Sequence, residues 1–200
     1  MTAALMATPA LAADVKIGVL LGFTGPIESL TPDMASGAEL AMKEASDSGA
    51  FMSGSKIISV RGDSTCVDAA AATATAERLI TSDGVSAIMG ADCSGVTTAV
   101  LQNVALAKGV VMISPSATSP ALSTIEDNGL FFRTSPSDAR QGQVLAEILR
   151  EKGVKSAAIS YTNNDYGKGL ADSIQNNFEN LGGKVTITAS HEDGKGDYGA

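Results

Sequence analysis

Short apolar runs alternate along the chain with longer segments in which apolar residues recur every three or four positions. The short runs predict buried parallel strands: Val15–Leu21, Ile57–Val60, Val85–Met89, Val110–Ile113, Leu130–Arg133, Ala157–Ser160 and Val185–Ala189. The longer segments predict helices: residues 34–45, the Ala-rich stretch from its Asp68 cap to about Thr81, Val96–Ala107, Asp138–Glu151 and Tyr166–Leu181. This alternation predicts an α/β fold built on parallel sheets.

The loop Arg133–Ser137 is the best candidate for a boundary between two lobes. We expect a first lobe over residues 14–135 and the start of a second lobe over residues 136–200. Only two strands are predicted in the second part, and a sheet that small seldom stands alone. The second lobe is therefore expected to be truncated, and the chain to be the N-terminal part of a longer protein.

Residues 1–13 are small and mostly apolar, and Ala10-Leu11-Ala12 fits the A-x-A pattern of a secretory cleavage site. We interpret them as the remnant of a signal peptide, with a disordered Ala-rich tail as the alternative. The first interpretation predicts an exported, periplasmic protein. No later segment contains the roughly 20 apolar residues that a membrane span requires.

The composition argues against a nucleic-acid partner. The formal net charge is −8, aromatic residues make up 4% of the chain, and there is no Trp. A basic surface and a stacking platform for bases are therefore both unexpected. Cys66 and Cys93 are the only cysteines, and in an exported protein an even number suggests a disulfide; two free buried thiols are the alternative. With His191 as the single histidine, no metal site or cofactor is predicted.

Two clusters of small and hydroxyl-bearing residues, Asp92–Gly95 and Ser114–Pro120, each follow a predicted strand. They are expected side by side at the carboxyl ends of neighbouring strands, where ligands bind in open α/β sheets. Hydroxyls and the free N–H groups of a helix start suit a carboxylate. The alternative is that Ser94 and Thr118 are ordinary cap and turn residues.

Other chemistry is poorly supported. Gly18, Gly22 and Gly25 do not have the spacing of a dinucleotide-binding turn, so flexibility at a turn explains them better. Neither Ser94 nor Ser116 sits in a nucleophile motif. We therefore predict no enzymatic activity.

Five motifs, in order, resemble the periplasmic substrate-binding proteins of branched-chain amino-acid ABC transporters. These are Val15–Val19 with Thr24-Gly25-Pro26, Gly62–Cys66, Gly90–Ser94, Ile113–Thr118 and Asp165–Gly169. The resemblance covers nearly all of the chain from Asp14. It implies a type I periplasmic binding protein fold, with two Rossmann-like lobes that close on a ligand about a hinge.

The resemblance also implies a Cys66–Cys93 disulfide and a set of ligand contacts. Ser94 and Thr118 would bind the α-carboxylate by hydroxyl and backbone N–H. The Ser116 carbonyl would hold the α-ammonium with Thr118, and Tyr166 would close over the ligand. The acidic partner of the ammonium is expected outside these 200 residues. The candidate contacts are Leu30, Asp92, Cys93, Ser94, Ser116, Ala117, Thr118 and Tyr166.

Two positions depart from the pattern of the family. Leu30 stands where well-known members have a pocket Tyr, and Asp92 stands where they have an apolar residue. A carboxylate at the wall of an apolar pocket is unfavourable unless it is paired. We therefore expect either a polar or cationic ligand beside Asp92, or an orientation that sends Asp92 to solvent.

The sequence thus predicts a monomeric, exported solute-binding protein. It would capture a small amino acid or related carboxylate and deliver it to the membrane permease of an ABC transporter. The alternatives are a ligand-sensing domain of the same fold, a binder of a non-amino-acid carboxylate or amide, and an exported α/β enzyme.

Overall fold

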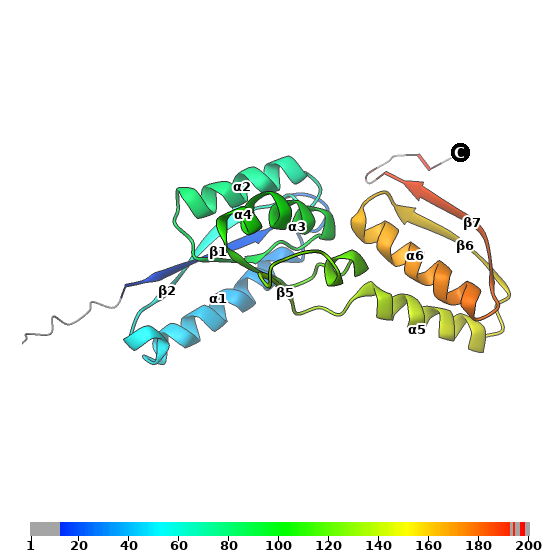
Figure 1. Cartoon of the computed structure of the whole chain (residues 1–200), viewed down its shortest axis with the longest axis horizontal. Coiled ribbons are helices and arrows are strands. Elements are labelled where there is room, and N and C mark those ends of the chain that lie inside the picture. Colours follow the sequence, from blue (N-terminus) through cyan, green and yellow to red (C-terminus); the bar gives the residue numbers. More distant parts are fainter. Residues whose placement is uncertain (1–12, 193, 195–196, 199–200) are drawn as a thin grey trace, which may run out of the picture.

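The computed structural model describes residues 13–192, 194 and 197–198. The predicted signal segment, apart from Ala13, lies outside these residues. Figure 1 shows two units connected by a single segment, the first built on a five-stranded sheet and the second on a two-stranded sheet. Among the described residues, no helix is both long and apolar enough to cross a membrane.

The first unit is a parallel sheet with strand order β2-β1-β3-β4-β5. Its strands are β1 (Val15–Leu21), β2 (Ile57–Asp63), β3 (Ala87–Gly90), β4 (Val111–Ser114) and β5 (Phe131–Arg133). Its helices are α1 (Thr31–Asp47), α2 (Ala69–Thr81), α3 (Ser94–Val100) and α4 (Leu106–Lys108), with a π-turn, η2 (Leu101–Ala105), joining the last two. Short 3₁₀ turns lie at η1 (Phe51–Ser53) and η3 (Pro120–Ser123).

The central position of β1 explains its continuous apolar run. Val19, Leu20 and Leu21 are completely buried. Leu20 packs in the main core with α2 and α3, while Val19 and Leu21 pack on the opposite face with Ala35 of α1. Strands covered on both faces lose the usual alternation of polar and apolar residues.

Helix α2 begins where the sequence predicted. The Asp68 carboxylate accepts hydrogen bonds from the backbone N–H groups of Ala70 and Ala71, at 2.9 and 3.0 Å. This satisfies two of the donors that a helix start leaves free. The predicted Asp68 cap is confirmed.

Several predicted boundaries differ from the observed ones. Val85 is buried, but its N–H donates to the Leu79 carbonyl, so it belongs to the turn after α2 and not to β3. Strand β2 continues three residues past Val60, because Arg61–Asp63 pair in register with the end of β1 despite being polar. The helix predicted over Val96–Ala107 starts two residues earlier and contains the π-turn.

The second unit consists of α5 (Asp138–Glu151), β6 (Ser156–Thr162), α6 (Asp165–Asn180) and β7 (Lys184–His191). Strands β6 and β7 are parallel. Helices α5 and α6 pack closely, since a side chain at Gly142 would collide with Ser173. The predicted boundary between residues 135 and 136 falls in the segment that joins β5 to α5 (Figure 1).

Candidate functional site

The two hydroxyl-rich clusters lie side by side at the carboxyl ends of β3 and β4. These strands are neighbours in the sheet, as predicted. The Ser116 hydroxyl donates to the Asp92 carbonyl at 3.0 Å, and the Ser119 N–H donates to the Ser94 Oγ at 3.1 Å. The juxtaposition expected from the sequence is confirmed.

Ser94 is the first residue of α3 and is 2% exposed. Its Oγ accepts the hydrogen bond from Ser119, and no described residue accepts a hydrogen bond from its hydroxyl. Cys93, which precedes it, occupies the cap position of the helix and is half-buried. The Ser94 hydroxyl therefore keeps its one hydrogen available as a donor.

The loop after β4 offers a donor and an acceptor. Within the described part of the chain, neither the Thr118 N–H nor the Ser116 carbonyl has a hydrogen-bond partner. Both residues are half-buried. Ala117 differs, because it is completely buried and its N–H donates to the Ser114 Oγ at 2.9 Å. The structure thus presents Ser116 and Thr118, and not Ala117, with free backbone groups.

Asp92 does not lie at a solvated rim. Its side chain is 2% exposed, so the expectation that it faces solvent is wrong. Its carboxylate accepts hydrogen bonds from the Gly22 N–H, the Ser64 hydroxyl at 3.0 Å and the Cys93 N–H at 2.9 Å. Three internal donors satisfy the acid without a cationic ligand, which explains how it is accommodated beside apolar residues.

The disulfide joins the loop after β2 to the start of α3, and Asp92 joins the loop after β1 to the same helix start. Cys66 and Cys93 are bonded, with their Cα atoms 5.2 Å apart, as the resemblance implied. Gly22, held by Asp92, also accepts a hydrogen bond from the Thr31 hydroxyl at 3.0 Å. Leu30 stands next to Thr31 and is 56% exposed.

Tyr166 is the second residue of α6 and is 45% exposed. The start of α6 is held by Asn164, whose side chain accepts a hydrogen bond from the Gly167 N–H at 2.8 Å. Helix α6 contacts α3 and η3 of the first unit. Tyr166 is therefore carried by the element of the second unit that approaches the two clusters.

Asp138, which the sequence did not single out, lies against Thr118. It is 1% exposed, and its N–H donates to the Thr118 carbonyl at 2.9 Å. Its Oδ2 has no hydrogen-bond partner among the described residues. Burial raises the pKa of the Asp138 carboxyl, while a hydrogen bond from the Thr118 hydroxyl and the nearby charge of Arg133 act in the opposite direction. An acid in the first turn of a helix is common, so its sequence position carried no signal of this environment.

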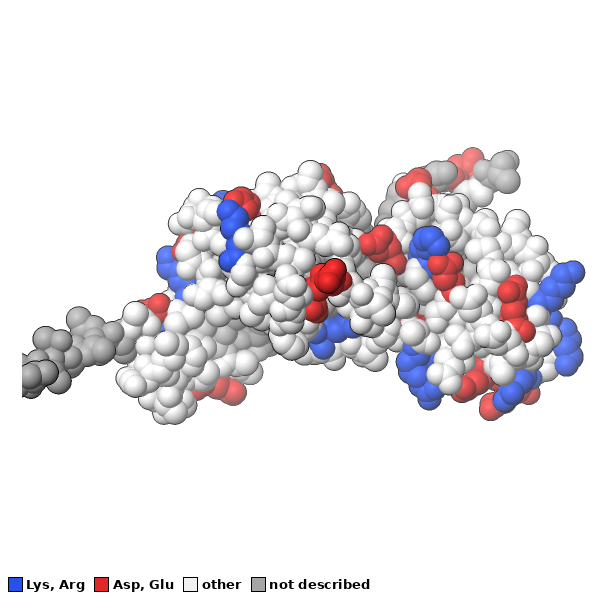
Figure 2. All heavy atoms as spheres, viewed as in Figure 1, with Lys and Arg blue, Asp and Glu red and all other residues white. Residues whose placement is uncertain are grey.

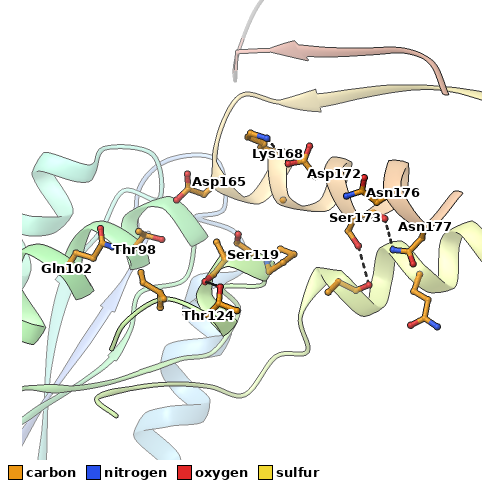
Figure 3. A pocket seen from close by; sticks show the side chains of 16 residues that line it. Thr98, Gln102, Ser119, Thr124, Asp165, Lys168, Asp172, Ser173, Asn176 and Asn177 are labelled. Atoms are coloured by element: carbon orange, nitrogen blue, oxygen red, sulfur yellow. Dashed lines mark hydrogen bonds and ion pairs between the residues drawn. The ribbon is translucent and has the colours of Figure 1, made fainter. Parts of the chain in front are cut away.

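A groove of about 900 Å³ separates the two units (Figure 3). From the first unit it is lined by Thr98, Gln102, Ser119, Pro120, Ala121, Thr124 and Ile125, and from the second by side chains of α5 and α6. None of the predicted ligand contacts lines it, although Ser119 and Asp165 adjoin Thr118 and Tyr166 in sequence. The groove thus lies next to the clusters without including them.

The charges on the visible face of the molecule do not form a binding surface for a polyanion. In Figure 2, acidic and basic side chains are interspersed on the visible face and form no continuous basic stripe. In the described ranges, no group of three or more His, Cys, Asp or Glu side chains is arranged to hold a metal ion.

Comparison with known proteins identifies the family. The family model described as "Periplasmic binding protein" matches residues 14–200. The chain belongs to the periplasmic binding protein family. Members of this family are binding proteins and not enzymes, and the fold class predicted from the sequence is that of the family.

Several relatives of this periplasmic binding protein are described as amino-acid binders. It is 32% identical over 189 residues to a Leu/Ile/Val-binding protein from Citrobacter freundii, covering 92% of this chain and 50% of that protein. A leucine-binding protein from Thermotoga maritima is 27% identical, with a TM-score of 0.82 over 92% of this chain and 51% of the other. A branched-chain amino-acid binding protein from Streptococcus pneumoniae, solved with isoleucine, is 29% identical, with a TM-score of 0.78 over 92% and 51%. The chain spans about half the length of these relatives.

Proposed function

We propose that this chain is part of an extracytoplasmic solute-binding protein that captures a small amino acid, branched-chain or related, and delivers it to the permease of an ABC importer. The observation that carries the proposal is the pair of hydroxyl-rich clusters joined by the Ser119–Ser94 hydrogen bond of 3.1 Å. This pair brings a free hydroxyl hydrogen close to a free backbone N–H and a free carbonyl. An α-amino acid needs donors for its carboxylate and acceptors for its ammonium.

Each group has a proposed role. The Ser94 hydroxyl and the Thr118 hydroxyl and N–H bind the α-carboxylate, and the Ser116 carbonyl, with Thr118, helps to hold the α-ammonium. Tyr166 closes over the ligand from the second unit. The protein is divided at residues 135 and 136 into two lobes, and closure of the lobes about the joining segment traps the ligand.

Asp92 and Cys93 support this site from behind. Asp92 holds the Gly22 turn and the start of α3, and the Cys66–Cys93 disulfide ties the loop after β2 to the same helix start. Leu30, carried on the segment held by Thr31 and Gly22, forms part of the pocket wall when the lobes close. A disulfide in a protein of this size suits an oxidising compartment, which supports a periplasmic location.

Calorimetry on the full-length protein tests the proposal. The ligands are leucine, isoleucine, valine and threonine, with benzoate and acetamide as non-amino-acid probes. Ser94→Ala and Thr118→Val each remove one hydroxyl beside a charged ligand group. Each variant should weaken amino-acid binding by about 1.5–3 kcal/mol, which is roughly 10- to 150-fold in Kd.

Ser82→Ala is the matched control, because Ser82 is an exposed serine at the amino ends of the strands, on the far side of the sheet. It should bind like the wild type. Unchanged affinity in both Ser94→Ala and Thr118→Val, or no amino-acid binding by the wild type, would overturn the assignment. An amino-acid binder that supports no uptake by a transporter would instead have a sensing role.

A further inference from the structure

The second unit touches the first beside the candidate site, at Gly169 of α6. Gly169 is the last residue of the Asp165–Gly169 motif, and no ligand contact is proposed for it. A Cβ atom at Gly169 would lie 2.8 Å from the Pro120 Cδ and 3.0 Å from the Ser119 Oγ, both in the loop after β4. Carbon atoms in ordinary contact are about 3.5–4.0 Å apart. The backbone of α6 therefore approaches this loop more closely than a residue with a Cβ atom would allow.

The close approach occurs on the face of α6 that is turned toward the first unit. Six residues at helical spacing line the groove from this face (Figure 3): Asp165, Lys168, Gly169, Asp172, Ser173 and Asn176. Among these six, Gly169 alone lacks a side chain, and it lies where Ser119 and Pro120 meet the helix. The glycine therefore decides how closely the two units can approach at this end of the groove.

Ser119 is held firmly on the side of the first unit. It is 2% exposed, its N–H donates to the Ser94 Oγ at 3.1 Å, and its carbonyl accepts from the Arg133 guanidinium at 2.8 Å. The next residue, Pro120, has a rigid ring that fixes its φ angle. A side chain at Gly169 would therefore push α6 away from the loop, or else displace Ser119 and break its hydrogen bonds.

Either displacement would reach a proposed ligand contact. Tyr166 precedes Gly169 by three residues, so the two are neighbours on one side of α6. Moving α6 away at Gly169 would draw Tyr166 away from the ligand. Moving Ser119 would instead release the Ser94 Oγ, which accepts from the Ser119 N–H. The fit of Gly169 against the loop thus affects ligand contacts from both units.

Resting on the proposed function, we infer that Gly169 is a positioning residue whose missing side chain lets α6 pack against Ser119 and Pro120, and that this contact sets the affinity for every ligand held between the lobes. Gly169 acts through Tyr166 and Ser94 and does not itself touch the ligand. A change at Gly169 should therefore alter the affinity for different ligands by a similar factor and leave the selectivity unchanged.

Calorimetry on the full-length protein tests the inference with leucine, isoleucine, valine, threonine, benzoate and acetamide. Gly169→Ala adds only the Cβ atom that would collide with the loop. It should raise the Kd of each ligand that the wild type binds by at least 10-fold, and by a similar factor for each. Alanine favours a helix over glycine. The melting temperature of the ligand-free variant should therefore equal or exceed that of the wild type.

Gly37→Ala is the matched control, because Gly37 lies within α1 and a Cβ atom there would meet nothing within 4 Å. It should bind like the wild type. Pro120→Ala provides a rescue, since it removes the Cδ that the new side chain would meet, while the Ser119 Oγ can rotate away. In the Pro120→Ala background, Gly169→Ala should raise the Kd less than 3-fold. The two effects are then non-additive, as expected for residues in contact.

The outcomes separate the contact from folding and from the identity of the ligand. If Gly169→Ala binds like the wild type, or Pro120→Ala does not reduce its effect, the inference is wrong while amino-acid capture stands. If Gly169→Ala lowers the melting temperature of the ligand-free protein, Gly169 serves the folding of α6 and the inference is wrong. If only benzoate or acetamide binds the wild type, amino-acid capture is wrong and that ligand tests the inference. If none of the six binds, both are wrong.

Discussion

Two buried aspartates lie near the same pair of strand ends but differ in the hydrogen bonds that their carboxylates accept. Asp92 is 2% exposed and Asp138 is 1% exposed, so both have lost their contact with water. Asp92 accepts hydrogen bonds from three internal donors, on Gly22, Ser64 and Cys93. Asp138 has one carboxylate oxygen that accepts no hydrogen bond from the described part of the chain.

This difference distinguishes Asp92, which stabilises the fold, from Asp138, whose carboxylate can still accept a hydrogen bond from a ligand. A buried acid whose lone pairs are filled can be removed only by leaving its donors unsatisfied. A buried acid with an oxygen that accepts no hydrogen bond lowers the stability of the ligand-free protein. Substitutions around Asp92 should therefore change mainly the stability of the protein, and substitutions around Asp138 mainly ligand binding.

Removing the disulfide should have the largest effect on stability. Cys66 and Cys93 are 27 residues apart in sequence, and closing a loop of that size stabilises by about 3.5 kcal/mol in the chain-entropy model. Cys66→Ser with Cys93→Ser should lower the free energy of unfolding by about that amount. Denaturant unfolding of the full-length protein under non-reducing conditions measures it. A loss below about 1 kcal/mol would show that Asp92 alone holds this region.

Asp92→Asn should destabilise somewhat less, by about 2–3 kcal/mol. The amide has one accepting oxygen in place of two, and its NH₂ group must face the N–H of Gly22 or that of Cys93. The same denaturant unfolding measures the loss. Asp68→Asn is the matched control, because Asn is also a good helix cap and the exposed α2 start should lose only a few tenths of a kcal/mol. If Asp92→Asn is as mild as this control, the difference between the two buried acids does not hold.

The fold was largely predictable because its strands and helices follow simple periodic patterns. The strand Val15–Leu21 and the helix Asp138–Glu151 have the predicted bounds. The errors fell where a polar residue pairs in the sheet, as Arg61 does, or where a buried apolar residue serves a turn, as Val85 does. Local patterns do not record which backbone groups will be paired.

The candidate site was predictable only in part. The positions of Ser94 and Thr118 followed from the ends of two neighbouring strands. The environment of Asp92 did not, because its donors on Gly22 and Ser64 lie 70 and 28 residues away. Asp138 had the sequence context of an ordinary helix start, and only the packing around Thr118 distinguishes it. Whether a buried acid accepts hydrogen bonds depends on residues far away in the sequence, and a single sequence does not show those contacts.

Asp138→Asn should have the smallest effect on stability and the opposite sign. Burial raises the pKa of Asp138 above its ordinary value of 3.8, despite the Thr118 hydroxyl and Arg133. The unfolded chain therefore ionises first as the pH rises, and the wild type loses stability between that value and the raised pKa. The variant should be more stable than the wild type by about 1 kcal/mol at pH 7, and the gain should vanish below about pH 3. Unfolding across this pH range measures the gain, and a destabilised variant at pH 7 would place Asp138 with Asp92 among the residues that hold the scaffold.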